Sequence, residues 1–149
     1  MTKREEREHL FKLLFCKDFH DMAELQEQVD LYQTQQELFN EEEFAPVRKK
    51  LDAVVKEEGS IDMILSDAAS GWRLNRMGKA ELTILRIAVY EIRYDEEVPD
   101  KVAINEAVEL AKKYGSDASS GFVNGVLAKV VGKCNQKGSV SSPGDEVDF

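Results

Sequence analysis

The stretch KAELTILRIAVYEIRY, residues 79–94, decides the fold class of this chain. Projected on a helix at about 100° per residue, its apolar side chains fall on almost every side. These side chains are Leu82, Ile84, Leu85, Ile87, Ala88, Val89 and Ile92. A helix that is apolar nearly all round has to be buried. We therefore expect this segment to be a central helix with other helices packed around it.

The rest of the chain also has a helical composition. It has only three prolines, and its long segments are rich in Glu, Lys, Leu and Ala, which favour helix. We expect about seven helices, over residues 3–20, 22–39, 44–57, 61–69, 79–94, 101–114 and 117–132. The expected N-caps include Ser60, Asp100 and either Ser116 or Asp117. The sequence therefore predicts an all-α fold.

The length of 149 residues fits one domain, or two small subdomains that share a core. Cys16 and Cys134 stand alone in apolar patterns, so we interpret both as free thiols. His9 and His20 are too few and too scattered for a metal site. No metal or other cofactor is expected. Residues 135–149 are polar and rich in Gly and Ser, which predicts a disordered tail.

Membrane insertion and secretion are not expected. No apolar run approaches the roughly 20 residues of a membrane span, and the charged N-terminus lacks a signal-peptide cleavage site. A cytoplasmic location is expected. The formal net charge of −9 argues against indiscriminate nucleic-acid binding. The excess acid lies in residues 18–97, however, so an anion-binding surface should come from the first helix and the last helices.

Catalytic patterns are not found in the sequence. There is no nucleophile–base pair, Gly-rich phosphate loop or HExxH motif, and the carboxylates are spread along helix surfaces. A run such as Glu41–Glu43 is typical of a solvated helix face. We therefore expect a protein that is not an enzyme.

The first helix carries a group of basic residues. In helical projection Lys3, Arg4 and Arg7 share one side, while the neighbouring glutamates fall elsewhere. This arrangement predicts a small cationic tip at the N-terminal end of the helix. The alternative interpretation is a frayed terminus with solvated charges.

The last helix places an aromatic residue at the edge of its core face. That face consists of Val123, Val126, Leu127 and Val130. Phe122 falls beside it, with Lys129 and Lys133 on the same edge. An aromatic ring flanked by amines suits a splayed-out nucleic-acid base. The alternative is a core-edge ring covered by another helix, with the lysines extending over it.

These segments resemble one known family. ILRIAVYEI, followed by VPDKVAINEAVELAKKYGSDASSGFVNGVLAKV, resembles the C-terminal half of the NusB transcription antitermination family. GWRLNRM resembles the segment that precedes it in that family. The resemblance is strong over Gly71–Val131 and looser over the first helix. It implies one helical domain over about residues 1–134, built from two small bundles at about 1–70 and 71–134.

The resemblance also implies a function. Proteins of this family bind the boxA element of nascent single-stranded RNA together with NusE, a small-subunit ribosomal protein. They act with other antitermination factors on RNA polymerase, notably on ribosomal RNA operons. Carried over by position, the implied RNA-binding residues are Lys3, Arg4, Arg7 and Phe122, with Lys129 and Lys133 nearby. The implied NusE-facing residues are Phe15 and Glu81, and a second RNA-facing aromatic of some relatives falls on Ala69.

The glutamates at positions 5, 6 and 8 depart from the arginine-rich motif of that family. They favour an alternative function, in which the same fold is a helical protein-interaction module, even a self-associating one, with weak or no RNA binding of its own.

Overall fold

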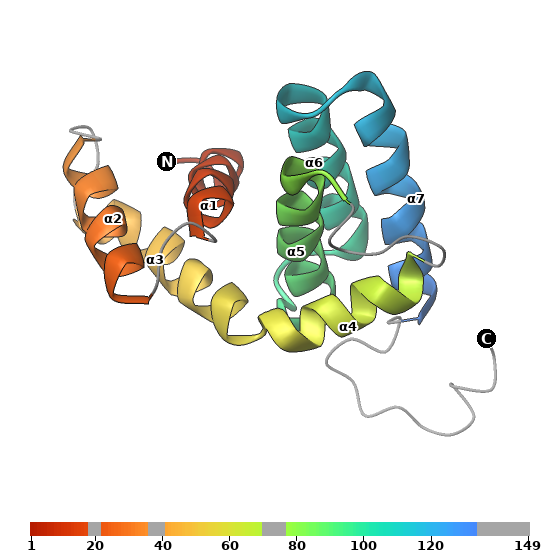
Figure 1. Ribbon diagram of the computed structural model, residues 1–149, viewed down its shortest axis with the longest axis horizontal. Coiled ribbons are helices and arrows are strands. Elements are labelled where there is room, and N and C mark those ends of the chain that lie inside the picture. The colour runs from red at the N-terminus through yellow and green to blue at the C-terminus, as the bar shows by residue number, and fades with distance from the viewer. Residues whose placement is uncertain (18–21, 36–40, 70–76, 134–149) are drawn as a thin grey trace. The chain divides into compact units, whose positions relative to one another are not determined.

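The computed structural model describes residues 1–17, 22–35, 41–69 and 77–133, and these ranges are built from seven helices without a strand (Figure 1). The helices are α1 (Lys3–Lys17), α2 (Met22–Gln35), α3 (Glu41–Lys56), α4 (Glu58–Ala68), α5 (Lys79–Tyr94), α6 (Asp100–Tyr114) and α7 (Asp117–Lys133). The predicted all-α class is confirmed. The expected tail at 135–149 and the GWRLNRM segment through Arg76 lie outside the described residues.

The chain divides into two compact units, Met1–Lys56 and Glu57–Phe149. The division falls before α4, whereas the sequence predicted it near residue 70. The reason is that α4 packs on α5 and α7, where it lies across one end of the two helices (Figure 1). Arg86 of α5 donates hydrogen bonds to both carboxylate oxygens of Asp62 in α4, each at 2.9 Å. Such a bidentate pair fixes both distance and orientation.

The second unit has α5 at its centre, as its sequence predicts. This helix packs against α4, α6 and α7. Its side chains are buried along most of its length, and Ile84, Leu85, Val89 and Ile92 are fully inaccessible. The helices α6 and α7 run side by side and each contributes one apolar face to this core (Figure 1).

The first unit is built on the contact between α1 and α3. The buried residues of α3 recur every three or four positions, as expected for one helix face: Phe44, Val47, Leu51 and Val54. The third helix of the unit, α2, contributes the buried Leu25 and Val29 to the core and also makes polar contacts. His9 Nδ1 and the Tyr32 hydroxyl are hydrogen-bonded at 2.5 Å, and Arg48 pairs with Asp30 at 2.6 Å.

Three helices begin earlier than predicted. α6 begins at Asp100, one residue before the predicted start, with Pro99 as its N-cap, so the prediction of Asp100 as a cap is wrong. α3 begins at Glu41, three residues before the predicted start, because acidic residues in a first turn are favoured by the helix dipole. α4 begins at Glu58, with Glu57 as its N-cap, so the prediction of Ser60 as a cap is wrong. None of the helices in the described ranges is long and apolar enough to cross a membrane.

Candidate nucleic-acid interface

The seventh helix, α7, carries the aromatic residue singled out from the sequence. Its inner face is buried through Val123, Val126, Leu127 and Val130, which follow helical spacing. Phe122 is half-buried, next to this face. The predicted position at the edge of the core is therefore confirmed. Whether the ring contacts RNA stays a prediction.

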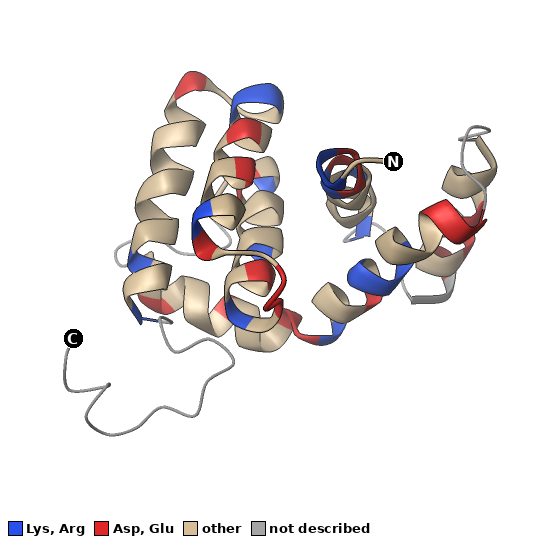
Figure 2. Ribbon diagram, turned by 180° about the vertical axis from the view of Figure 1, so that it is seen from behind, with Lys and Arg blue, Asp and Glu red and all other residues tan. Residues whose placement is uncertain are grey.

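The charges of α7 are confined to its ends. Only Asp117, Lys129 and Lys133 are charged, and Figure 2 shows the middle of the helix in tan, the colour of uncharged residues. Lys129 is exposed. Lys133 Nζ lies 3.0 Å from the Asp67 carboxylate of α4, with both side chains more than half exposed. An exposed pair of this kind contributes little stability, so Lys133 can exchange its partner for a phosphate at small cost.

The outer face of α7 next to Phe122 is made of small residues. Ala118, Gly121, Gly125, Ala128 and Gly132 are all exposed. A Cβ added at any of the three glycines would meet nothing within 4 Å. Within the described part of the chain, no side chain therefore lies over the helix backbone at these glycines.

Ser119 lies one helical turn before Phe122. It is 3% exposed, and its hydroxyl donates a hydrogen bond to the Glu81 carboxylate of α5. The same hydroxyl accepts a hydrogen bond from the Ser116 backbone N–H at 3.0 Å. The start of α7 is thus tied to the start of α5.

Two glycines make this contact possible. A Cβ at Gly115 would lie 2.6 Å from Ser119 Oγ and 2.9 Å from the Ala111 carbonyl oxygen. A Cβ at Gly78 would run into the Glu81 carboxylate. The one signal in the sequence is local: Gly78 and Glu81 stand at the N-cap and N3 positions of α5, the spacing of a capping box. Nothing local points to Ser119.

The basic residues of α1 are divided by the structure. The Lys3 side chain is 84% exposed and lies 3.7 Å from Glu6, and Arg4 is exposed too. Arg7 is only 7% exposed. The expectation that all three cations face solvent therefore has to be corrected for Arg7, because the side of the helix that it shares with Leu10 is buried.

The glutamate at position 5 has a structural explanation. Thr2 and Glu5 form a capping box, in which the Glu5 N–H donates to Thr2 Oγ1 at 3.1 Å and the Thr2 N–H donates to Glu5 Oε1 at 2.7 Å. These bonds lower the pKa of the Glu5 carboxyl. This cap was not among the predicted N-caps, although T-x-x-E at residues 2–5 is its sequence signature. The alternative of a frayed terminus loses support as a result.

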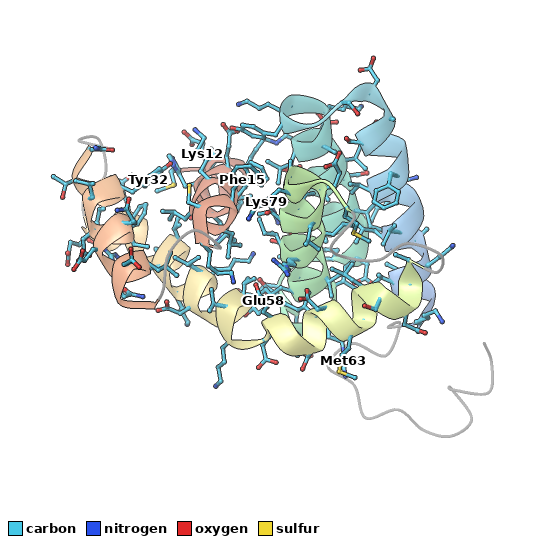
Figure 3. All side chains as sticks on the ribbon, viewed as in Figure 1. Lys12, Phe15, Tyr32, Glu58, Met63 and Lys79 are labelled. Carbon is cyan, nitrogen blue, oxygen red and sulfur yellow. The ribbon has the colours of Figure 1, made fainter. Side chains whose placement is uncertain are left out.

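The two residues implied to face NusE lie in different units. Phe15 is half-buried on α1, with its ring centroid 5.8 Å from that of Phe11 (Figure 3). Glu81 is half-buried in α5 and engaged by Ser119. Ala69, which takes the place of a second aromatic, is buried. No group of three or more potential ligands for a metal ion occurs among the described residues.

The fold and the helix-borne candidate residues define a class, the all-α proteins of NusB type. The structure superimposes on T. maritima NusB with a TM-score of 0.77 and 26% identity, over 100% of this chain and 99% of the other. It shares its fold, at a TM-score of 0.74 and 24% identity, with a chain in a crystal structure of antitermination factors NusB and NusE in complex with double-stranded RNA; 89% of this chain and 99% of that chain are covered.

The family follows from sequence comparison. The NusB family model matches residues 4–132. The transcription antitermination protein NusB of Lachnoclostridium phytofermentans is 56% identical over 131 residues, which cover 88% of this chain and 99% of the relative. The chain belongs to the NusB family of transcription antitermination proteins. The resemblance read from the sequence is confirmed.

Proposed function

We propose that this chain binds boxA-type single-stranded RNA together with NusE, and so keeps RNA polymerase transcribing through ribosomal RNA operons. The observation that carries the proposal is the placement of Phe122. It is a half-buried ring on a helix whose outer face carries small, exposed residues, in a chain of the NusB family. A base stacked on an aromatic ring of this kind contributes about 1–3 kcal/mol.

The proposed RNA contacts have two parts. Phe122 supplies the stacking surface, and Lys129 and Lys133 supply phosphate attraction on the same helix. Lys3 and Arg4 supply it on α1, with Arg7 as a more buried neighbour. Phe15 and Glu81 are the proposed contacts to NusE. The net charge of −9 supports a basic protein partner and limits the RNA affinity of the chain alone.

The proposal has a direct test. Labelled boxA RNA and a scrambled RNA of the same composition are titrated with the full chain, with and without NusE, at two salt concentrations. We expect boxA binding that weakens as salt rises, because phosphate contacts release counterions, and that strengthens when NusE is added, because two weak contacts on one RNA act together. Equal binding of both RNAs, unchanged by NusE, would contradict the proposal.

A second function, a helical protein-interaction module with little RNA binding, is favoured by one observation. Of the three candidate RNA-binding cations of α1, Arg7 is buried and Lys3 already lies near Glu6. The double substitution Lys3→Glu and Arg4→Glu separates the two functions. Loss of RNA from the complex with NusE supports the first function, and unchanged retention supports the second. The control is Lys49→Glu with Lys56→Glu, which changes the charge equally at exposed positions of α3.

Three further expectations belong with this proposal. The protein acts without enzymatic activity, as an adaptor. It acts in the cytoplasm, where nascent bacterial transcripts are found. Residues 1–134 form its working domain, which the family match over residues 4–132 supports. The tail predicted for residues 135–149 lies outside the described residues.

A further inference from the structure

The start of α7 is held by a small network centred on one hydroxyl. Ser119 Oγ has one proton to donate and two lone pairs. The proton is directed to Glu81, and one lone pair accepts the Ser116 N–H. The Ser116 hydroxyl lies 3.1 Å away and occupies the remaining position. The bonding capacity of Ser119 is therefore fully used, and its strongest bond, to a carboxylate, crosses to another helix.

This network lies in the first turn of α7, where it can restrict the movement of the Phe122 side chain. The first turn of a helix is where backbone groups lack partners and the chain frays. In α7 this turn is closed by the Ser119 N–H, which donates to the Ser116 carbonyl oxygen at 2.9 Å, and it is tied to α5 through Glu81. Phe122 lies one helical turn after Ser119, at position i+3, and side chains three positions apart are neighbours on a helix surface.

We propose that Ser119 is a positioning residue, through which Glu81 on α5 holds the first turn of α7 and the Phe122 ring in the orientation that receives an RNA base. The inference rests on the proposed function. It adds that Glu81, the residue implied to face a protein partner, also acts on RNA binding in the absence of that partner.

If Glu81 positions α7, removal of its carboxylate should change RNA affinity in the direction opposite to that expected from charge alone. Removal of an acidic residue should strengthen binding to RNA if only charge matters, because one repulsive charge disappears. Removal of the Glu81 carboxylate should instead weaken binding if the carboxylate positions α7. The amide of a Gln at this place keeps an oxygen that accepts the Ser119 proton, so Glu81→Gln should restore what Glu81→Ala loses.

The experiment measures boxA RNA affinity of the full chain at low salt, where phosphate attraction is strongest. We expect Ser119→Ala and Glu81→Ala each to weaken binding about three- to tenfold, because a less ordered ring has to be immobilised when the RNA binds. Glu81→Gln should stay within about twofold of the wild-type affinity. The control for the serine is Ser120→Ala, whose hydroxyl bonds only within its own turn, to the Asp117 carbonyl oxygen at 3.2 Å. The control for the charge is Glu109→Ala on α6, which is exposed and should bind as tightly as the wild type or more tightly.

Each outcome decides between the possibilities. Unchanged or tighter RNA binding by Glu81→Ala, together with unchanged binding by Ser119→Ala, overturns the inference and leaves the proposed function standing. Failure of the wild type to bind boxA RNA in preference to scrambled RNA, with or without NusE, overturns the proposed function first. Thermal unfolding is followed for every variant. If Ser119→Ala does not fold, the comparison of Glu81→Ala with Glu81→Gln decides, since Glu81 is only half-buried.

Discussion

Phe122 and Val123 are neighbours in the chain with different surroundings. Val123 is fully buried in the core of the second unit, while Phe122 stays half-buried beside an exposed glycine on each side, Gly121 and Gly125. The small residues of its own helix do not complete the burial of the ring, and a Cβ added at either glycine would meet nothing within 4 Å. The residue is therefore placed for contact with a flat ligand at moderate cost in stability.

The substitution Phe122→Ala should weaken boxA RNA binding by about 1–3 kcal/mol, the contribution of one stacked base. The loss of unfolding free energy should stay below that of Leu127→Ala, which opens a cavity in the core and costs about 2–5 kcal/mol. Fluorescence titration and urea unfolding measure the two quantities. Val131→Ala, at a half-buried position of the same helix, is the control. A large stability loss with unchanged RNA affinity would assign Phe122 to the core instead.

His9 connects α1 to α2 through the hydroxyl of Tyr32, which Figure 3 shows directed from α2 toward α1. Partial burial lowers the pKa of His9, and the charge of Lys12 acts in the same direction, while Glu8 and Glu5 oppose both. Burial also raises the pKa of Tyr32. Both rings are therefore held in their neutral forms near pH 7.

Stability should fall as the pH is lowered because of His9. Its pKa in the unfolded chain is about 6.5 and its folded pKa is lower. Below pH 6.5 the unfolded state therefore binds the proton first, and the contribution of His9 declines until the pH passes the folded pKa. Urea unfolding at pH 7 and pH 5 should show a smaller loss for His9→Gln than for the wild type. An equal loss in both proteins would mean that other groups, and not His9, cause it.

Among the helices, α5 shows how the spacing of apolar residues determines where a helix forms and how deeply it is buried. It spans Lys79–Tyr94, as predicted, because its apolar residues reach all sides and its neighbours bury them. The ends of other helices were predicted less well. α4 carries Ser60 in its first turn, although this residue type favours the cap, because the helix continues back to Glu58. Arg86 binds Glu58 as well as Asp62, at 3.4 Å, and holds this extra turn against α5 (Figure 3).

The glycines around α7 should respond to alanine in opposite directions. Gly121→Ala should stabilise the protein by about 0.5–1 kcal/mol, because alanine is a better helix former and the added Cβ meets open space. Gly115→Ala should destabilise it, because the Cβ would be forced against Ser119 and the Ala111 carbonyl oxygen. Thermal unfolding of the two variants measures the difference. Equal effects would mean that the turn before α7 relaxes without cost.

For the whole molecule, the distribution of charge matters more than its sum. The net charge is −9, yet the first 17 residues hold five Lys/Arg and only three glutamates. A protein with this balance repels RNA in general and attracts it only at local basic sites. Specific RNA binding therefore depends on few phosphate contacts, and a basic protein partner is favoured by the rest of the surface.

The number of phosphate contacts can be measured from the salt dependence of RNA affinity. For a single strand, each phosphate contact contributes about 0.7 to the slope of log affinity against log salt. Lys129→Gln, Lys133→Gln and Arg4→Gln should each reduce the slope by about that amount in the presence of NusE. Lys49→Gln, at an exposed position of α3, should leave it unchanged. A slope unaffected by all three changes would remove these residues from the RNA contact.

The sequence by itself determined the all-α class, the central place of α5 and the edge position of Phe122, because each follows from residue spacing along one helix. Only the tertiary structure decided that α4 packs with α5 and α7, that Arg7 is buried, and that Ser119 bonds to Glu81. The last pair is separated by 38 residues in the chain. Its contact depends on how α5, α6 and α7 pack and on two glycines that permit close approach, and helical periodicity carries no information about either.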